Sequence, residues 1–317
     1  MNTAKIIVGD NRLTLDTIPE KSVQTVITSP PYWGLRDYGN DDQIGLEESP
    51  EQYVAEMVEV FAKVWRVLAD DGTLWLNLGD SYAGNNSRAS NNGRAGFGTE
   101  REGTFVKTGA GLKPKDLVGI PWRVAFALQQ AGWYLRSEII WHKPNPMPES
   151  VTDRPTKSHE HIFLLSKSQT YFYDAEAIKE PVTPSTVERL AQNVEDQEGS
   201  VRANGGKKDN GNMKAVGSFE FRNKRDVWTV ATRPFKGAHF ATYPKKLIEP
   251  CVLAGSKPGD TVLDPFSGSG TTGIVSIQNG RNYIGLELSP EYASISEQRI
   301  YDEVGLMGSV EIINVNT

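Results

Sequence analysis

Residues 28–39, "TSPPYWGLRDYG", place two consecutive prolines and two large aromatic side chains directly after an apolar run. Each proline fixes one backbone φ angle, and together Pro30 and Pro31 remove two backbone N–H donors. An ordinary turn exposes small polar residues at the positions that Tyr32 and Trp33 occupy. The stretch therefore predicts a rigid corner with aromatic faces at the end of a strand, which is more than a connecting turn requires.

A second stretch has the spacing of a nucleotide-binding turn. Residues 260–287, "DTVLDPFSGSGTTGIVSIQNGRNYIGLE", follow the pattern strand, glycine-rich turn, helix, strand. Gly268, Gly270 and Gly273 match G-x-G-x-x-G, and Glu287 lies 19 residues after Gly268, where a ribose-binding acid is expected. The pattern leaves two readings open: a dinucleotide site, or a plain strand–turn–helix connection that binds nothing.

Asp264 argues against a dinucleotide, because it stands at the carboxyl end of the first strand, just before the turn. A carboxylate at that point repels a pyrophosphate, which binds to backbone N–H groups and a helix N-terminus. It attracts a cofactor that carries positive charge there. S-adenosyl-L-methionine fits, because its sulfonium and ammonium groups are cationic and its ribose diol suits Glu287.

In this order, "TSPPYW" and "DPFSGSGTTG" resemble the amino-group DNA methyltransferases of the β class (SPPY type), in which the catalytic motif precedes the cofactor motif. "KIIVGD" resembles the strand that contacts the cofactor's adenine. "GTLWLNLGDSY" and "WYLRSEIIWHKPNPMPES" resemble later sheet motifs, and "HFATYPKKLIEPCVLAG" resembles the helix before the cofactor loop. The resemblance implies an α/β, Rossmann-like S-adenosylmethionine-dependent methyltransferase sheet, circularly permuted, with an inserted irregular target-recognition region.

The resemblance also implies a chemistry for the corner. The hydroxyl of Ser29 and the carbonyl of Pro30 each accept a hydrogen bond from the exocyclic amine of a base. The nitrogen can then move toward sp³ geometry and attack the methyl group in line with sulfur. Pro31 helps to fix the direction of that carbonyl. Tyr32 supplies a stacking face for a base rotated out of the duplex, and Trp33 extends the pocket wall that meets DNA.

The remaining site residues follow from the matched motifs. The expected cofactor-binding residues are Asp10, Thr242, Asp264, Pro265, Phe266, Gly268, Gly270, Thr271, Thr272 and Glu287. The expected DNA-binding residues are Trp33, Arg222, Lys224 and Arg225. A serine at position 29 favours the N4 of cytosine as methyl acceptor, and the N6 of adenine stays the alternative.

Three other functions compete with this hypothesis. A C5-cytosine methyltransferase needs a cysteine nucleophile, which Pro250-Cys251 could supply. Cys251 lies in the pattern of a buried helix face, however, and is expected in the core. An RNA or protein-amide methyltransferase could use the same corner, and a catalytically silent nucleic-acid-binding protein is the third rival. A silent binder gives no reason for Ser29, Asp264 and Glu287 to occur together.

Charge is distributed unevenly along the 317 residues, whose net charge is −6. Residues 41–60 carry seven acids and no Lys or Arg, whereas residues 201–245 carry ten Lys or Arg against three acids. The basic stretch indicates either a face for a polyanion, here double-stranded DNA, or a solvated loop.

A cognate restriction endonuclease, an orphan or phage-borne origin without one, and a homodimer all remain open.

Composition excludes several classes of protein. One cysteine rules out a disulfide framework, and the close pair His159 and His161 has no evident third ligand, so no metal site is expected. No apolar run approaches the roughly 20 residues of a membrane span. We therefore expect a soluble cytoplasmic protein without a membrane partner.

Periodicity places these residues on an α/β sheet with mostly parallel strands. Expected strands are 5–8, 23–28, 73–78, 134–141, 161–166, 261–263 and 282–286. Residues 51–68 form an amphipathic helix, Asp71-Gly72 turn the chain into the next strand, and Ser289 caps a C-terminal helix. Loops are expected at 83–111 and over most of 182–227, apart from a short helical start at 185–190. The predicted division is 1–146 catalytic half, 147–234 target-recognition region including the strand near 161–166, and 235–317 cofactor half. Asp10 and Asp264 should then lie near opposite ends of one cofactor.

Overall fold

The computed structural model describes residues 2–40, 42–83, 111–191, 220–232, 242–305 and 308–314. Two compact units divide the chain, Met1–Tyr173 with Asp226–Thr317, and Asp174–Arg225. The strands of the larger unit are β1 (Asn2–Val8), β2 (Val23–Thr28), β3 (Leu68–Leu78), β4 (Tyr134–His142), β5 (His159–Ser166), β8 (Val227–Thr229), β9 (Thr261–Asp264), β10 (Asn282–Glu287) and β11 (Gly308–Asn314). Its helices are α1 (Asn11–Thr14), the 3₁₀ turn η1 (Leu15–Thr17), α2 (Pro50–Val67), α3 (Ile120–Gln130), α6 (Lys245–Gly255), α7 (Thr271–Gln278) and α8 (Pro290–Val304).

These strands form one mixed sheet in the order β11-β1-β10-β9-β2-β3-β5-β4-β8. Neighbours pair in parallel except at β5, which is antiparallel to both β3 and β4. The expected α/β sheet with mostly parallel strands is confirmed. The carboxyl ends of β1, β10, β9, β2, β3 and β4 consequently share one edge, where open α/β sheets bind ligands.

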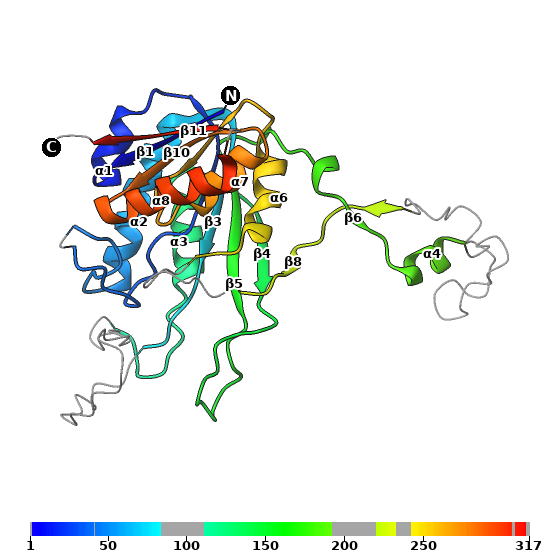
Figure 1. The fold of residues 1–317 in the computed structure, drawn as a ribbon. Coiled ribbons are helices and arrows are strands. Elements are labelled where there is room, and N and C mark those ends of the chain that lie inside the picture. Colours follow the sequence, from blue (N-terminus) through cyan, green and yellow to red (C-terminus); the bar gives the residue numbers. More distant parts are fainter. Residues whose placement is uncertain are drawn as a thin grey trace. The chain divides into compact units, whose positions relative to one another are not determined.

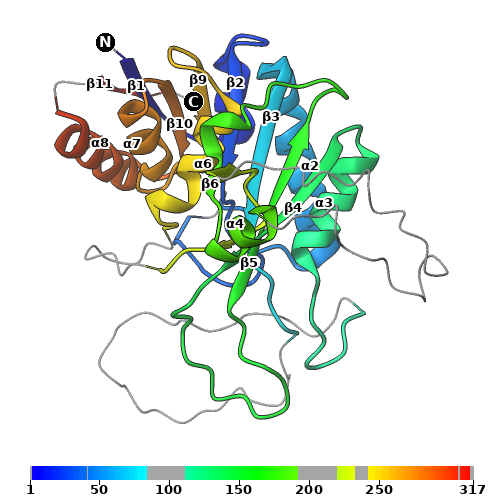
Figure 2. The same ribbon diagram turned by 90° about the vertical axis from the view of Figure 1, so that its right-hand side faces the viewer.

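Helices cover both faces of the sheet, as the alternation of side chains along β1 requires. Ala4, Ile6 and Val8 pack with residues of α7 and α8, whereas Ile7 belongs to the core that α2 and α3 cover. Figure 2 shows α7 and α8 on one side of the strands and α2 and α3 on the other. The two cores hold the strand ends, and therefore the loops that follow them, in fixed positions.

Local sequence explains where the long helices begin. The side chain of Ser49 accepts a hydrogen bond from the backbone N–H of Gln52, whose side chain in turn accepts from the Ser49 N–H, and Pro50 follows at the first helical position. Ser289 caps α8 in a similar way through the N–H of Tyr292. The predicted helix at 51–68 and the predicted cap at Ser289 are both confirmed.

The first and the last strands of the chain are neighbours. β1 lies between β10 and β11 (Figure 1), and β2 pairs with β9 (Figure 2). Strands from the two ends of the chain therefore lie side by side in the sheet. In the chain, the corner after β2 comes before the glycine-rich turn after β9. That this order arose by circular permutation stays a prediction.

Some elements differ from the sequence analysis. Asp71-Gly72 do not form a turn, because β3 already begins at Leu68 and pairs with β2 across a register shift. The sequence analysis identified neither β8 and β11 nor the helix α3. Cys251 is 1 % exposed on α6, so its expected place in the core is confirmed.

The smaller unit, Asp174–Arg225, has little regular structure in its described part. It contains the 3₁₀ turn η2 (Glu176–Ile178), the short antiparallel pair β6 (Glu180–Pro181) and β7 (Phe221–Arg222), and α4 (Pro184–Ala191). Helix α4 matches the expected helical start at 185–190. Most of the expected loop at 83–111 and most of the basic stretch 201–245 lie outside the described residues.

Within the described ranges, no helix is both long and apolar enough to cross a membrane. The same residues hold no group of three or more His, Cys, Asp or Glu side chains that could bind a metal ion. His161 instead pairs with Glu138 of the neighbouring strand at 2.6 Å.

Candidate functional site

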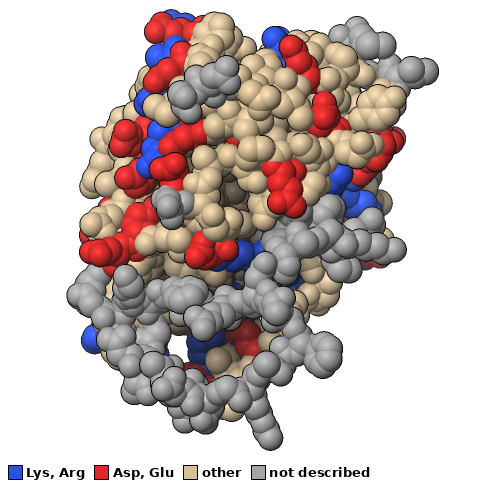
Figure 3. Space-filling view, turned by 60° about the vertical axis from the view of Figure 1, so that its left-hand side comes forward, with Lys and Arg blue, Asp and Glu red and all other residues tan. Residues whose placement is uncertain are grey.

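A pocket of about 290 Å³ opens at the carboxyl edge of the sheet. Its walls come from the turns after β1 and β9, the corner after β2, the ends of β10, β3 and β4, and the start of β5. Figure 3 shows a face of the molecule that is hollowed near its centre, with more Asp and Glu than Lys and Arg around the hollow. Such a concave site at strand ends is where a ligand of an α/β sheet is expected.

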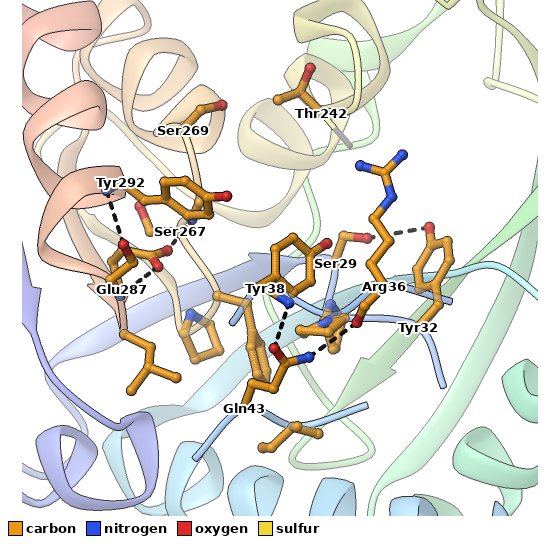
Figure 4. A pocket seen from close by; sticks show the side chains of 18 of the residues that line it. Ser29, Tyr32, Arg36, Tyr38, Gln43, Thr242, Ser267, Ser269, Glu287 and Tyr292 are labelled. Atoms are coloured by element: carbon orange, nitrogen blue, oxygen red, sulfur yellow. Dashed lines mark hydrogen bonds between the residues drawn. The ribbon is translucent and has the colours of Figure 1, made fainter. Parts of the chain in front are cut away.

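Glu287 organises one side of the pocket. Its carboxylate accepts hydrogen bonds from the backbone N–H groups of Gly268 (2.8 Å) and Ser289 (3.0 Å), which join the glycine-rich turn to the start of α8 (Figure 4). Burial raises the pKa of Glu287 to about 7, against these two hydrogen bonds. Each carboxylate oxygen keeps a further acceptor position, so Glu287 can still accept two hydroxyl groups of a ligand.

Asp10 faces the same pocket from the turn after β1. The backbone N–H of Gly9 donates to the Glu287 carbonyl at 2.9 Å, so the ends of β1 and β10 are held together there. The Asp10 carboxylate caps α1 and forms an ion pair with Arg12 at 2.6 Å. Asp10 and Glu287 thus line the same pocket at the edge of the sheet.

Asp264 takes an internal place that we did not expect. It is 1 % exposed and does not line the pocket. Its carboxylate accepts hydrogen bonds from Thr28 (2.6 Å), Thr272 (2.6 Å), Tyr243 (3.1 Å) and the backbone N–H of Phe266 (3.1 Å). Burial raises the pKa of Asp264, and the Thr272 and Thr28 hydroxyls oppose that shift.

The geometry of Asp264 favours a supporting role over direct contact with a ligand. Four donors already occupy the carboxylate, and they come from β2, α7, the segment before α6 and the turn itself. Asp264 thereby ties the corner strand β2 to the glycine-rich turn. The attraction between Asp264 and a cationic cofactor, which we predicted from its place in the sequence, is at most an effect through space.

The predicted corner lies on the opposite side of the pocket from Glu287 (Figure 4). Ser29, Pro30, Pro31 and Tyr32 all line the pocket. The corner is held from behind, because the buried hydroxyl of Tyr53 on α2 donates to the Pro31 carbonyl at 2.9 Å. The rigid corner that two prolines predict is therefore anchored to a helix as well.

Three pocket residues beside the corner were missed by the sequence analysis: Asn77, Lys143 and Glu160. The Tyr32 hydroxyl donates to Glu160 at 2.6 Å, and the other carboxylate oxygen of Glu160 pairs with the Lys143 ammonium. The Asn77 amide donates to the Ser29 hydroxyl (3.2 Å), to Tyr32 (2.8 Å) and to Glu160 (3.0 Å). The Lys143 ammonium also lies 4.3 Å from the ring centre of Trp141, a further pocket residue.

The pocket collects most of the predicted cofactor residues. Those that line it are Asp10, Thr242, Pro265, Phe266, Gly268, Thr271 and Glu287. Those that do not are Asp264, Gly270 and Thr272. Gly270 instead permits close packing, because its φ is +75° and a Cβ there would stand 2.1 Å from the Ser296 hydroxyl of α8.

The predicted DNA-binding residues do not line the pocket. Trp33 is 2 % exposed and donates its indole N–H to the Glu47 carbonyl at 3.0 Å, so it is a core residue and not a pocket wall. Arg222 and Arg225 belong to the smaller unit, where both donate to the Glu180 carboxylate at 2.9 and 2.8 Å. Lys224 lies between them in the sequence.

The charges of the pocket fit a cation better than a phosphate. Its lining residues include four carboxylates, Asp10, Asp42, Glu160 and Glu287, and two basic side chains, Arg36 and Lys143. A pyrophosphate would meet repulsion there, and the N–H of Gly268 already donates to Glu287. The repulsion of a pyrophosphate and the attraction of a cationic cofactor, which we expected from Asp264, therefore come from the carboxylates that do line the pocket.

Comparison with known families and proteins gives consistent matches. Residues 23–298 match the model of the family described as DNA methylase. The type II methyltransferase M.Cfr9I of Citrobacter freundii is 50% identical over 308 residues, which are 96% of this chain and 89% of that protein. The type II methyltransferase M.SmaI of Serratia marcescens is 46% identical over 305 residues, 95% of this chain and 91% of that protein.

Two solved structures have the same fold at low sequence identity. PvuII DNA methyltransferase (cytosine-N4-specific) superimposes with a TM-score of 0.61 at 19% identity, covering 98% of this chain and 95% of that one. The putative DNA modification methylase TTHA0409 of Thermus thermophilus, complexed with S-adenosyl-L-methionine, gives a TM-score of 0.60 at 24% identity, covering 98% and 99%. Both likenesses concern the α/β methyltransferase fold.

Proposed function

The chain belongs to the DNA methylase family of amino-group methyltransferases, and from that premise we propose that it transfers a methyl group from S-adenosyl-L-methionine to the N4 amine of a cytosine in double-stranded DNA. The observation that carries the proposal is the joint presence of Ser29, Pro30 and Glu287 in one pocket. These residues supply acceptors for an amine at one side and for a ribose at the other.

The cofactor fits the Glu287 side of the pocket. The Glu287 carboxylate, which the N–H groups of Gly268 and Ser289 hold in place, would accept hydrogen bonds from the cofactor's ribose hydroxyls. The acidic lining favours the cationic methionine end, and Asp10, Phe266 and Thr242 complete the binding site. S-adenosyl-L-methionine supplies an activated methyl group. Its complex with TTHA0409, which has the same fold, is consistent with this assignment.

The corner activates the target amine. An exocyclic base amine is a poor nucleophile because its lone pair is delocalised into the ring. Ser29 and the Pro30 carbonyl each accept one amine hydrogen and so favour the pyramidal nitrogen of the transition state. Because prolines and the Tyr53 hydroxyl fix the corner, these acceptors need no reorganisation during the reaction. Delivery of the base requires that it leave the duplex, with the Tyr32 ring at the pocket wall.

The choice of cytosine rests on Ser29. A neutral hydroxyl accepts hydrogen bonds less strongly than a carboxylate, and the resemblance to SPPY-type enzymes favours cytosine N4 for serine at this position. Adenine N6 is the second candidate, since it presents the same amine geometry to the same two acceptors. A non-catalytic nucleic-acid-binding role is less well supported, because it leaves the pocket without a purpose.

We assign recognition of the DNA target sequence to residues 147–234. This range contains the smaller unit, Asp174–Arg225, with Arg222, Lys224 and Arg225 as candidate phosphate contacts. The names of the relatives support a role in type II restriction-modification. A cytoplasmic location and a cognate endonuclease as partner belong to the same proposal. A homodimer is compatible with that role.

Product analysis tests the proposal. Purified protein is incubated with plasmid DNA and S-adenosyl-L-methionine, and the DNA is digested to nucleosides for mass spectrometry. We expect N4-methyldeoxycytidine and no new N6-methyldeoxyadenosine. N6-methyldeoxyadenosine alone would transfer the assignment to adenine, and the absence of any methylated base across diverse DNA would contradict the methyltransferase proposal.

A further inference from the structure

A partly buried ion pair stands directly behind the corner, and the chemistry described so far gives it no role. The side chains of Lys143 and Glu160 are 19 % and 13 % exposed and come from the end of β4 and the start of β5. Removing two charges from water is costly unless both are paired and hydrogen-bonded. Here Glu160 also accepts hydrogen bonds from Tyr32 and Asn77. The partners of its carboxylate, Lys143 included, are therefore residues of the pocket wall.

The hydrogen bonds from Ser29 to Glu160 run in one direction. The Tyr32 hydroxyl donates to Glu160 at 2.6 Å, and the Ser29 hydroxyl lies 3.4 Å from the Tyr32 oxygen, positioned to donate to it. Asn77 donates to the Ser29 oxygen. One lone pair of Ser29 therefore remains for the pocket. The Ser29–Tyr32 contact is long, as catalytic hydrogen bonds often are outside the reactive complex.

We infer that Glu160, acting through Tyr32, strengthens Ser29 as an acceptor for the target amine and receives the proton that the amine loses. This inference rests on the proposed methyl transfer to an exocyclic amine. A chain of donors that ends on a carboxylate polarises every member. Glu160 thus supplies, two hydrogen bonds away, the negative charge that a serine lacks.

The proton balance closes within the chain. As the amine nitrogen bonds to the methyl carbon, the carbon–sulfur bond of the sulfonium would break and leave a neutral thioether, so the positive charge passes to the nitrogen, which must lose one hydrogen. That proton passes to the Ser29 oxygen, the Ser29 hydroxyl proton passes to Tyr32, and the Tyr32 proton passes to Glu160. The base becomes neutral, Glu160 becomes a neutral acid, and both hydroxyls are restored. Solvent later removes the proton from Glu160.

Electrostatics keeps each member in the required state. Burial acts to raise the pKa of Glu160, but Lys143 and the hydrogen bonds from Tyr32 and Asn77 outweigh it, so the pKa lies below its ordinary value. Glu160 is therefore ionised before reaction. Burial and the nearby Glu160 charge raise the pKa of Tyr32, so its hydroxyl keeps the proton that it donates.

A double-mutant cycle tests the inference. Tyr32→Phe breaks the chain and keeps the ring, and Glu160→Gln removes the charge. Since Glu160→Gln leaves Lys143 unpaired, Lys143→Met/Glu160→Gln serves as a second variant without a lone buried charge. The matched control is Tyr171→Phe, which removes a tyrosine hydroxyl that accepts from Arg136 and lies outside both the chain and the pocket lining. Single-turnover rates at saturating DNA and cofactor are measured together with both dissociation constants.

We expect Tyr32→Phe and the variant Lys143→Met/Glu160→Gln each to slow methylation on the order of 10- to 100-fold, with dissociation constants unchanged and Tyr171→Phe close to wild type. Combining the two changes should add little, because either one interrupts the same chain. Losses that multiply, or a Tyr32→Phe rate equal to that of Tyr171→Phe, would overturn the inference. A wild-type protein that methylates no DNA would refute the proposed function instead.

Discussion

At the scale of single residues, the pocket depends on carboxylates whose surroundings give them different roles. Asp264 is fully hydrogen-bonded inside the protein, Glu160 is paired with Lys143, and Glu287 accepts from backbone N–H groups, Gly268 and Ser289 among them, without a basic side chain as partner in the described residues. The Glu287 carboxylate is consequently the one best placed to bind ligand hydroxyls. Its burial has a measurable cost in the absence of a ligand, because the pKa of about 7 lies above its ordinary value of 4.5.

The raised pKa of Glu287 predicts a pH dependence of stability. The folded protein binds this proton more tightly than the unfolded chain, so the contribution to stability is fully present below pH 4.5 and is lost as pH rises through about 7. Between pH 5 and 8 the wild type should lose about 2–3 kcal/mol of unfolding free energy relative to Glu287→Gln. Urea denaturation of both proteins at pH 5 and pH 8 measures their unfolding free energies. An equal change with pH in the two proteins would show that Glu287 is already ionised at pH 5.

The sequence identified one side of the reaction centre and missed the other for a physical reason. Two prolines restrict the backbone whatever surrounds them, so a rigid corner was predictable from the residues alone, and the resemblance then implied the roles of Ser29 and Pro30. Glu160 became meaningful only when β5 paired with β3 and brought it to Tyr32. One signal was available: an acid between His159 and His161 at the head of an apolar strand, where a charge needs a partner.

Burial explains the error at Trp33. An aromatic residue beside a predicted pocket can either line it or support it, and the sequence does not distinguish the two. The indole donates to the Glu47 carbonyl and fills the core beneath the corner. Asp264 is a similar case, because its hydroxyl partners Thr28, Tyr243 and Thr272 are brought together only by the fold.

At the scale of elements, the glycine-rich turn works through packing more than through ligand contact. Gly268 lines the pocket and donates to Glu287, whereas Gly270 and Gly273 allow α7 to approach α8 and Tyr283. A Cβ at Gly273 would stand 2.7 Å from both Ile300 and Tyr283. The G-x-G-x-x-G spacing thus reports a tight strand–turn–helix unit, which explains why it did not by itself distinguish a dinucleotide from another cofactor.

Strong periodicity determined which elements were predictable. The amphipathic α2 and the apolar central strands are buried by their own pattern, and their predicted positions are confirmed within a few residues. β11 and β8 are edge strands with exposed residues, so their pairing depends on a neighbour rather than on a pattern. Asp71-Gly72 indicated a turn in the sequence, because a register shift between paired strands is built from the same residue types as a turn.

At the scale of the whole molecule, the face around the pocket and the candidate DNA-binding residues carry charge of opposite sign. Asp and Glu outnumber Lys and Arg on the face shown in Figure 3, in keeping with the net charge of −6. The cationic excess of the sequence lies in residues 201–245. If DNA is the substrate, its backbone must be attracted mainly by that part of the chain.

Replacing Arg222, Lys224 and Arg225 with Gln should therefore weaken DNA binding and reduce its dependence on salt, while S-adenosyl-L-methionine affinity is unchanged. Each lost phosphate contact reduces the magnitude of the negative slope of log affinity against log salt by about 1. Glu180→Gln is the matched opposite, since it removes the carboxylate that pairs with Arg222 and Arg225, and it should tighten binding. Affinity measured across a salt series decides: unaltered slopes in both variants would identify the basic stretch as a solvated loop.

The central claim is that the Ser29 hydroxyl stabilises the amine in the transition state, and single-turnover methylation by Ser29→Ala tests it most directly. The variant keeps the Pro30 carbonyl, the Tyr32 ring and the Glu287 site, so dissociation constants for DNA and S-adenosyl-L-methionine should be unchanged. Ser22→Ala, an exposed serine before β2, is the control. At saturating DNA and cofactor we predict a rate about 10²–10³-fold below wild type for Ser29→Ala, and a wild-type rate for Ser22→Ala. Equal rates for wild type and Ser29→Ala would mean that Ser29 only shapes the corner and would contradict the mechanism.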